Sequence, residues 1–176
     1  MFDKLKLTHT YAALPGINRL ISYGALHYDY IADGPHTAAF NVIPEEYRKD
    51  FKLLQMMIDT MVYSKVPAHT DSYILSTINF YITTASSVTE FYKVDQDKLK
   101  TSKGPNQTTG DVFDSSCITP AGSFLAKPGE AWLLDVTVPH SVTSFNKREN
   151  RVAIALQSHI HSYARVKEFL QETGNL

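Results

Sequence analysis

Hydrophobic and polar positions follow two different periods along this chain. Between residues 44 and 63, large apolar side chains recur every three or four positions, at Tyr47, Phe51, Leu54, Ile58, Met61 and Val62. This spacing predicts an amphipathic helix. Pro44 suits the first turn of that helix, and Glu45 and Glu46 suit the positive end of its dipole. The Val66-Pro67 pair ends the helix and begins an extended segment.

From residue 67 to residue 157 the period changes to two, which is typical of β-strands. The clearest case is the stretch 73–82, where Thr77, Asn79 and Tyr81 alternate with Ile78, Phe80 and Ile82. One face of this strand is polar, so it either meets solvent or lines a site inside a barrel-like sandwich. Further strands are predicted at 89–94, 118–126, 131–136 and 152–156, and one or two at 20–31.

Two other segments complete the pattern. Residues 95–116 are polar and long for a structureless connection, so they are expected to form a mobile lid or, in our preferred interpretation, a flexible insertion. Residues 162–172 predict a short C-terminal helix, with Val166, Phe169 and Leu170 as its apolar positions.

Many short strands separated by Gly/Pro turns, after one helix, predict a mainly β fold of the jelly-roll or double-stranded β-helix type. The alternating helices that a parallel α/β fold needs are missing from the pattern. A length of 176 residues predicts a single domain. Within it, we expect N-terminal strands and a supporting helix over 1–66, the jelly-roll core over 67–157, and the C-terminal helix over 158–176.

Composition narrows the classes of function. The formal net charge is -1, and no run of five like charges occurs, so neither a nucleic-acid partner nor an anionic membrane is expected. Cys117 is the only cysteine, which rules out an intramolecular disulfide and fits a reducing compartment. The first residues lack the apolar core of a signal peptide, and no apolar run reaches about 20 residues. The expected location is the cytoplasm.

Three residues suggest a metal site. His69 and Asp71 are two positions apart, which on a regular strand places both side chains on one face. His140, on a distant strand, would complete a facial triad of two imidazoles and one carboxylate, which suits Fe(II). Zinc with three protein ligands is a competing interpretation. An H-x-D triplet alone also arises by chance, as a surface histidine followed by a turn-forming acid.

The order of the motifs is more specific than the triplet. H-x-D at 69–71 is followed by a strand-rich segment, W-L-L-D at 132–135, P-H-S-V at 139–142 and R-V-A-I-A-L at 151–156. With this order, the segment 67–157 resembles the core of the Fe(II)/2-oxoglutarate-dependent dioxygenases. The strands at 78–82 and 89–92 resemble those of the prolyl-hydroxylase-like members.

The resemblance implies a role for each candidate residue. Fe(II) would be held by His69, Asp71 and His140, and Arg151 would bind the far carboxylate of 2-oxoglutarate. The planar fork of an arginine fits a carboxylate better than a lysine does. The same likeness, together with strand parity, implies that Asn79 or Tyr81 hydrogen-bonds the co-substrate.

One position departs from the family pattern. Many members carry a hydroxyl two residues after the arginine, where this chain has Ala153. A different hydroxyl, with Tyr81 as the candidate, would have to support the co-substrate. Ala153 and Ala155 share a strand face with Arg151, where they either make room for a ligand or pack tightly.

The resemblance implies an enzyme that uses O2 and 2-oxoglutarate, releases succinate and CO2, and hydroxylates an amino acid or a peptidyl residue. Two alternatives stay open from the residues alone. One is a cupin-like metalloprotein, such as an isomerase or zinc hydrolase, which would keep the triad but not need Arg151. The other is a non-catalytic jelly-roll binding module.

Overall fold

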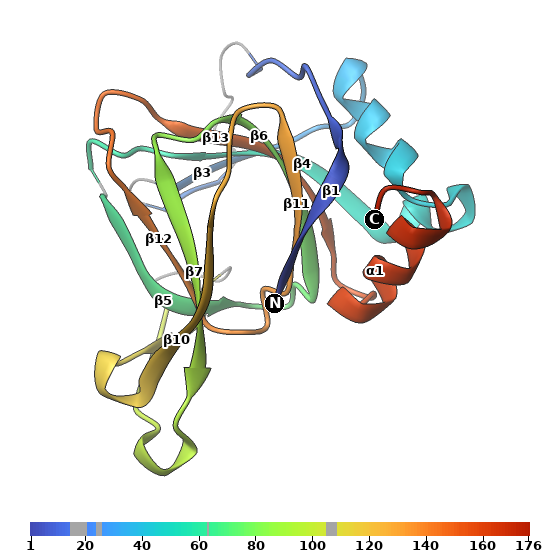
Figure 1. The fold of residues 1–176 in the computed structure, drawn as a ribbon. Coiled ribbons are helices and arrows are strands. Elements are labelled where there is room, and N and C mark those ends of the chain that lie inside the picture. Colours follow the sequence, from blue (N-terminus) through green and yellow to red (C-terminus); the bar gives the residue numbers. More distant parts are fainter. Residues whose placement is uncertain (15–20, 24–25, 63, 105–108) are drawn as a thin grey trace.

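Two antiparallel β-sheets face each other and form the body of the molecule (Figure 1). We describe a computed structural model in which residues 1–14, 21–23, 26–62, 64–104 and 109–176 are placed. The seven-stranded sheet contains, in spatial order, β1 (Phe2–Thr8), β11 (Glu130–Leu134), β6 (Ser76–Thr83), β13 (Arg151–Ser158), β4 (Phe51–Ile58), β3 (Leu26–Tyr30) and β2 (Ile21–Tyr23). The six-stranded sheet contains β10 (Ile118–Leu125), β7 (Ser87–Val94), β12 (His140–Ser144), β5 (Lys65–Asp71), β9 (Thr109–Phe113) and β8 (Thr101–Lys103).

Short helices complete the described chain. They are four 3-10 segments, η1 (Pro35–Val42), η2 (Glu45–Asp50), η3 (Gln96–Lys98) and η4 (Ser115–Cys117), and one α-helix, α1 (Tyr163–Glu172). The prediction of a mainly β, jelly-roll fold is confirmed by the two packed sheets. The C-terminal helix is also confirmed, and the Ser162 hydroxyl caps it by accepting a hydrogen bond from the Arg165 backbone N–H.

The helix predicted over residues 44–63 is wrong. Residues 45–50 form the 3-10 helix η2, and the chain then continues as the strand β4 between β13 and β3. Both faces of β4 are covered, so Phe51 and Leu53 are buried on one side and Leu54 and Ile58 on the other. A strand buried on both faces has no polar alternation, and its apolar residues then match a helical spacing by coincidence.

The segment 95–116, for which a structureless lid or flexible insertion was predicted, contains regular structure in the part that is described. β8 and β9 form a hairpin there, and β9 pairs with β5 through Val112 opposite His69 and Thr109 opposite Asp71. Residues 105–108 of this segment lie outside the described chain. The strand β1, which pairs with β11 at the edge of the larger sheet, was not predicted from the sequence.

The larger sheet is covered on both of its faces. The 3-10 helices η1 and η2 and the helix α1 lie on its outer side, and the smaller sheet lies on its inner side (Figure 1). Ile154 and Leu156 of β13 belong to the outer core together with Phe169 of α1. Ala153 of β13 belongs to the inner core, against Tyr81. Small residues on the inner face of β13 therefore leave space between the two sheets.

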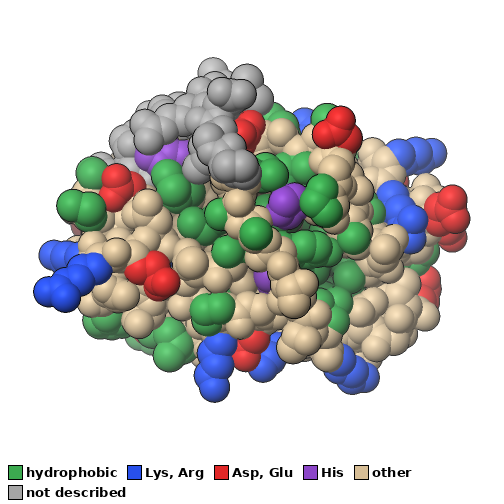
Figure 2. All heavy atoms as spheres, turned by 90° about the horizontal axis from the view of Figure 1, so that it is seen from above, with side chains coloured by type: hydrophobic (Ala, Val, Ile, Leu, Met, Phe, Trp, Pro, Cys, Tyr) green, Lys and Arg blue, Asp and Glu red, His purple; other side chains and the backbone are tan. Residues whose placement is uncertain are grey.

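Charged side chains lie mainly toward the margin of the face seen in Figure 2, where both signs are present. Hydrophobic and histidine side chains occupy much of its middle. No helix in the described ranges is both long and apolar enough to cross a membrane.

The packing of the outer core leads to a prediction about the stability of the protein. Ile154 is fully buried, whereas Ile160, six residues later, is 64% exposed. Ile154→Ala is expected to lower the free energy of unfolding by about 2–5 kcal/mol, because it removes buried methyl groups and leaves a cavity. Ile160→Ala is the matched control and is expected to change stability by less than about 0.5 kcal/mol. Urea titration followed by circular dichroism measures both, and equal losses would contradict this description of the core.

Candidate metal centre

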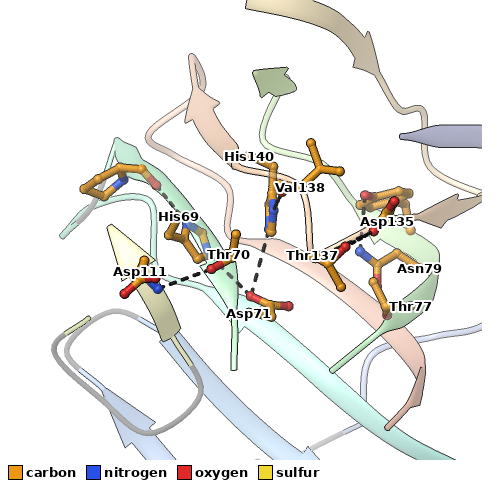
Figure 3. A network of polar contacts seen from close by, with 12 residues as sticks. His69, Thr70, Asp71, Thr77, Asn79, Asp111, Asp135, Thr137, Val138 and His140 are labelled. Carbon is orange, nitrogen blue, oxygen red and sulfur yellow. Dashed lines mark hydrogen bonds and ion pairs between the residues drawn. The ribbon is translucent and has the colours of Figure 1, made fainter. Parts of the chain in front are cut away.

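His69, Asp71 and His140 come from neighbouring strands of the smaller sheet. β5 carries the first two, β12 carries the third, and His140 lies opposite His69 in the register of this antiparallel pair. The two imidazole rings are 4.6 Å apart between centroids. All three side chains point toward one place between the sheets (Figure 3). Strand pairing thus brings together the residues that the sequence separated by about 70 positions.

The ligand atoms lie close enough to share one ion. The His69 Nε2 atom is 3.5 Å from Asp71 Oδ1, and the His140 Nε2 atom is 3.9 Å from the same oxygen. One ligand atom from each residue lies within 4.8 Å of the other two. Two imidazoles and a carboxylate bind Fe(II), zinc and related divalent metals, so the arrangement supports a metal without choosing among them.

Backbone carbonyls orient both imidazoles. The Nδ1 atom of His69 is 2.8 Å from the Pro67 carbonyl oxygen, and that of His140 is 3.0 Å from the Val138 carbonyl oxygen. A carbonyl only accepts, so each Nδ1 carries the hydrogen and each Nε2 presents its lone pair. This outer hydrogen bond is the usual partner of a metal-binding histidine, since it fixes both tautomer and ring orientation.

The two histidines differ in how readily they take up a proton. Burial, together with the neighbouring His69, lowers the pKa of His140 to about 4, so this imidazole is neutral at pH 7 and ready to bind a cation. Burial also opposes protonation of His69, but the hydrogen bond and negative charge of Asp71 outweigh it and raise the His69 pKa. The carboxylate therefore draws positive charge to this point.

The triad opens into a cavity between the two sheets. Much of its lining is apolar, and the residues that form it are Leu26, Tyr28, Met56, Ile58, Val66, Leu134, Val136 and Val142. The polar residues that line it, apart from the triad, are Thr77, Asn79, Thr89, Arg151 and Gln157. Two of the three candidate co-substrate residues, Asn79 and Arg151, thus share one cavity with the triad, and the third, Tyr81, contacts Arg151.

Arg151 is the most unusual of these residues because its charge is buried. The side chain is 5% exposed, and its Nη2 donates to the Tyr81 hydroxyl at 2.9 Å and to the Thr89 hydroxyl at 3.0 Å. Its Nη1 is buried and has no hydrogen-bond partner, and no carboxylate of the described chain forms an ion pair with it. Burying an unpaired guanidinium is costly, which suggests that an anionic ligand completes this site.

Tyr81 places a hydroxyl directly against Arg151. Its phenol oxygen accepts from Arg151, and the guanidinium carbon lies 5.1 Å from the Tyr81 ring centroid. Asn79 lies nearby, where its Oδ1 accepts from the Thr77 hydroxyl at 3.1 Å and its Nδ2 is 3.5 Å from the Tyr81 oxygen.

Two polar residues that contact or line the site, Thr89 and Gln157, were not predicted from the sequence. Thr89 contacts Arg151 from the opposite sheet, and no local spacing indicates a contact that depends on how two sheets pack. Gln157 could have been found from the sequence. It lies two residues after Ala155, so strand alternation places it on the same face as Arg151, Ala153 and Ala155.

Comparison with known proteins does not place the chain in a family. No family model and no curated protein matches it. Among solved structures it is similar to hazelnut (Corylus avellana) vicilin, with 11% identity over 82% of this chain and 32% of that chain and a TM-score of 0.45. It is also similar to a cupin-like protein from Thermotoga maritima, with 11% identity over 82% and 78% of the two chains and a TM-score of 0.40.

A third similar structure is that of the Fe(II) form of HppE, with 12% identity over 84% of this chain and 60% of that chain and a TM-score of 0.40. The chain spans about a third of the length of the vicilin it matches, and likenesses this distant assign no activity. Any conclusion about function therefore depends on the residues of the cavity.

Proposed function

We propose that the protein is an Fe(II)- and 2-oxoglutarate-dependent dioxygenase that hydroxylates an amino acid or a peptidyl residue. The observation that supports this proposal most is the buried, unpaired Nη1 of Arg151 in the same cavity as the triad. An isomerase or zinc hydrolase would use the triad but leaves this cation unexplained. A non-catalytic module leaves both features unexplained.

Each residue has a defined task under this proposal. His69, Asp71 and His140 would hold Fe(II), which, with O2 and 2-oxoglutarate, supplies the oxidising power and releases succinate and CO2. Arg151 would bind the far carboxylate of 2-oxoglutarate through its free Nη1, while Tyr81 and Thr89 hold the guanidinium in place.

The other side chains of the cavity orient and enclose. Asn79, on the strand next to β13, would present its amide to the co-substrate. The apolar lining would limit the entry of water and so protect a reactive site from side reactions. The protein's contribution is thus positioning and exclusion of solvent, as in other enzymes whose cofactor supplies the chemistry.

The deciding experiment is an anaerobic titration of the Fe(II)-loaded protein with 2-oxoglutarate. We expect a visible metal-to-ligand charge-transfer band that is absent in His69→Ala. Admission of air should then produce succinate slowly, even without a substrate. A protein that shows neither the band nor succinate is not a 2-oxoglutarate-dependent oxygenase.

Removal of the Tyr81 hydroxyl is expected to weaken the binding of 2-oxoglutarate only in part. Tyr81→Phe removes one of the two acceptors that hold Nη2 of Arg151, and a hydrogen bond to a charged group contributes about 1.5–3 kcal/mol. We expect the affinity for 2-oxoglutarate to fall by about tenfold, because Thr89 still holds the guanidinium. Tyr92→Phe is the matched control, since the Tyr92 hydroxyl bonds Glu90 and Ser141 instead. An equal effect of both variants on the titration would show that the Tyr81 hydroxyl has no particular role.

A further inference from the structure

The inner face of β13 carries polar groups at both of its ends. Arg151 lies at one end, and Ala153 and Ala155 lead along the same face to Gln157. Six residues of strand span about 20 Å, which is much longer than a five-carbon diacid. A co-substrate held by Arg151 therefore does not reach Gln157, so this second polar end serves a different molecule.

The second end lies on the Asp71 side of the metal centre. Gln157 pairs with Thr77 in the sheet, Thr77 pairs with Leu134, and the Asp71 backbone N–H donates to the carbonyl of Val136, two residues after Leu134. In the close-up, Thr77 and Asn79 lie near Thr137 (Figure 3). A molecule bound at Gln157 is thus placed next to the metal from the side opposite to Arg151.

The Gln157 side chain is available for binding. It is 93% buried, as its exposed fraction of 7% shows, and it lines the cavity. Within the described chain, no hydrogen bond to its carboxamide is found. The carboxamide is therefore open to a ligand in the cavity, and it offers one acceptor and two N–H donors. The neighbouring Thr77 and Asn79 already bond to each other, so Gln157 is the free recognition group.

The charges of the cavity restrict what can bind there. Apart from the two triad histidines, Asp71 is the only carboxylate and Arg151 the only base among its described lining residues. Under the proposed function one holds the metal and the other holds the co-substrate. The ammonium and carboxylate of a free amino acid would then be buried without partners, which is strongly unfavourable. A neutral amide can instead form two hydrogen bonds with the Gln157 carboxamide.

Two large, exposed apolar side chains follow the residues of this end closely in the sequence. Tyr73, two residues after Asp71, is 84% exposed, and Ile160, three residues after Gln157, is 64% exposed. The two segments that carry them are joined, because the Nδ1 of His159 lies 2.7 Å from the Tyr73 carbonyl oxygen. Tyr73 also adopts a φ of 63°, which a tyrosine rarely does and which structures tend to retain at functional sites. This exposed pair suits a chain longer than one amino acid.

We propose, on the basis of the function above, that the substrate is a residue within a peptide chain whose neutral amide pairs with the Gln157 carboxamide. Free amino acids are excluded as substrates. Gln157 is then the residue that determines specificity, and it touches the substrate rather than the metal or the co-substrate.

The test compares each standard amino acid, free and as its N-acetyl N-methylamide, as a ligand of the full chain. Saturation-transfer NMR on the metal-free and the Zn(II)-loaded protein measures binding, and the charge-transfer band of the Fe(II)-loaded protein reports on 2-oxoglutarate separately. We expect at least one capped compound to bind and its free counterpart not to bind. Gln157→Leu should weaken the capped compound by about tenfold or more and leave the 2-oxoglutarate band in place.

Other outcomes overturn the inference in distinct ways. Free amino acids that bind as well as capped ones, no capped compound that binds, or unchanged binding in Gln157→Leu would each contradict it. If Gln157→Leu does not fold, Gln157→Glu provides the same test, because a carboxylate there should also weaken the neutral probes. A missing 2-oxoglutarate band would refute the proposed function alone, since the NMR measurement does not depend on it.

Discussion

Alanine at any one of His69, Asp71 or His140 is expected to lower the affinity for Fe(II) by more than about 100-fold. Loss of an outer-shell partner already costs 10- to 100-fold at metal sites, and loss of a ligand costs more. The effect should be largest for Asp71, because its carboxylate lies within 3.9 Å of both Nε2 atoms and supplies the negative charge of the site. Anaerobic calorimetry with Fe(II) measures the affinity. A repeat with Mn(II) guards against errors from oxidation of the iron.

The chain contains a matched control for this prediction. His159 lies outside the triad and contacts the Tyr73 carbonyl, so His159→Ala should leave metal affinity unchanged. Circular dichroism should show that all four variants keep their β-structure, because the triad residues lie on the cavity side of strands that are held by backbone pairing. Tight metal binding that survives in Asp71→Ala would place the ion elsewhere.

The triad was predictable because each part of it obeys a local rule. Alternation along a strand places His69 and Asp71 on one face, and it places Thr77, Asn79 and Tyr81 together on the next strand. The same rule extends from Arg151 to Gln157. What remained was the choice of partner strand, and the resemblance in motif order supplied that choice for His140.

The fold was predicted wrongly where the local pattern of apolar and polar residues does not reveal the structure. β4 is buried on both faces, so its side chains do not reveal a period of two. β8 and β9 are short and polar, and their structure comes from pairing with each other and with β5. Neither Thr89 nor the unpaired state of Arg151 can be inferred from sequence, because both depend on the packing of one sheet against the other.

A buried cation without a counter-ion links stability to function in this protein. Arg151 donates two hydrogen bonds to hydroxyls. These bonds only partly compensate for the loss of hydration of its charge. A structural arginine would be expected to have a carboxylate partner. The retained cost is explained if the partner is a ligand, and stability and binding should then change in opposite directions when the charge is removed.

Arg151→Met is therefore expected to raise the free energy of unfolding of the metal-free protein by about 1–2 kcal/mol, because it replaces an unpaired buried charge by an apolar side chain of similar length. The same variant should bind 2-oxoglutarate weaker by about 2–5 kcal/mol, the usual effect of removing one partner of a buried charge pair. Arg151→Lys keeps the charge but not the planar fork, so it should recover only part of the binding. Urea titration and the anaerobic charge-transfer titration measure the two effects independently. If Arg151→Met loses stability by more than about 1 kcal/mol and binds 2-oxoglutarate normally, the arginine is a structural residue and the proposed function loses its main support.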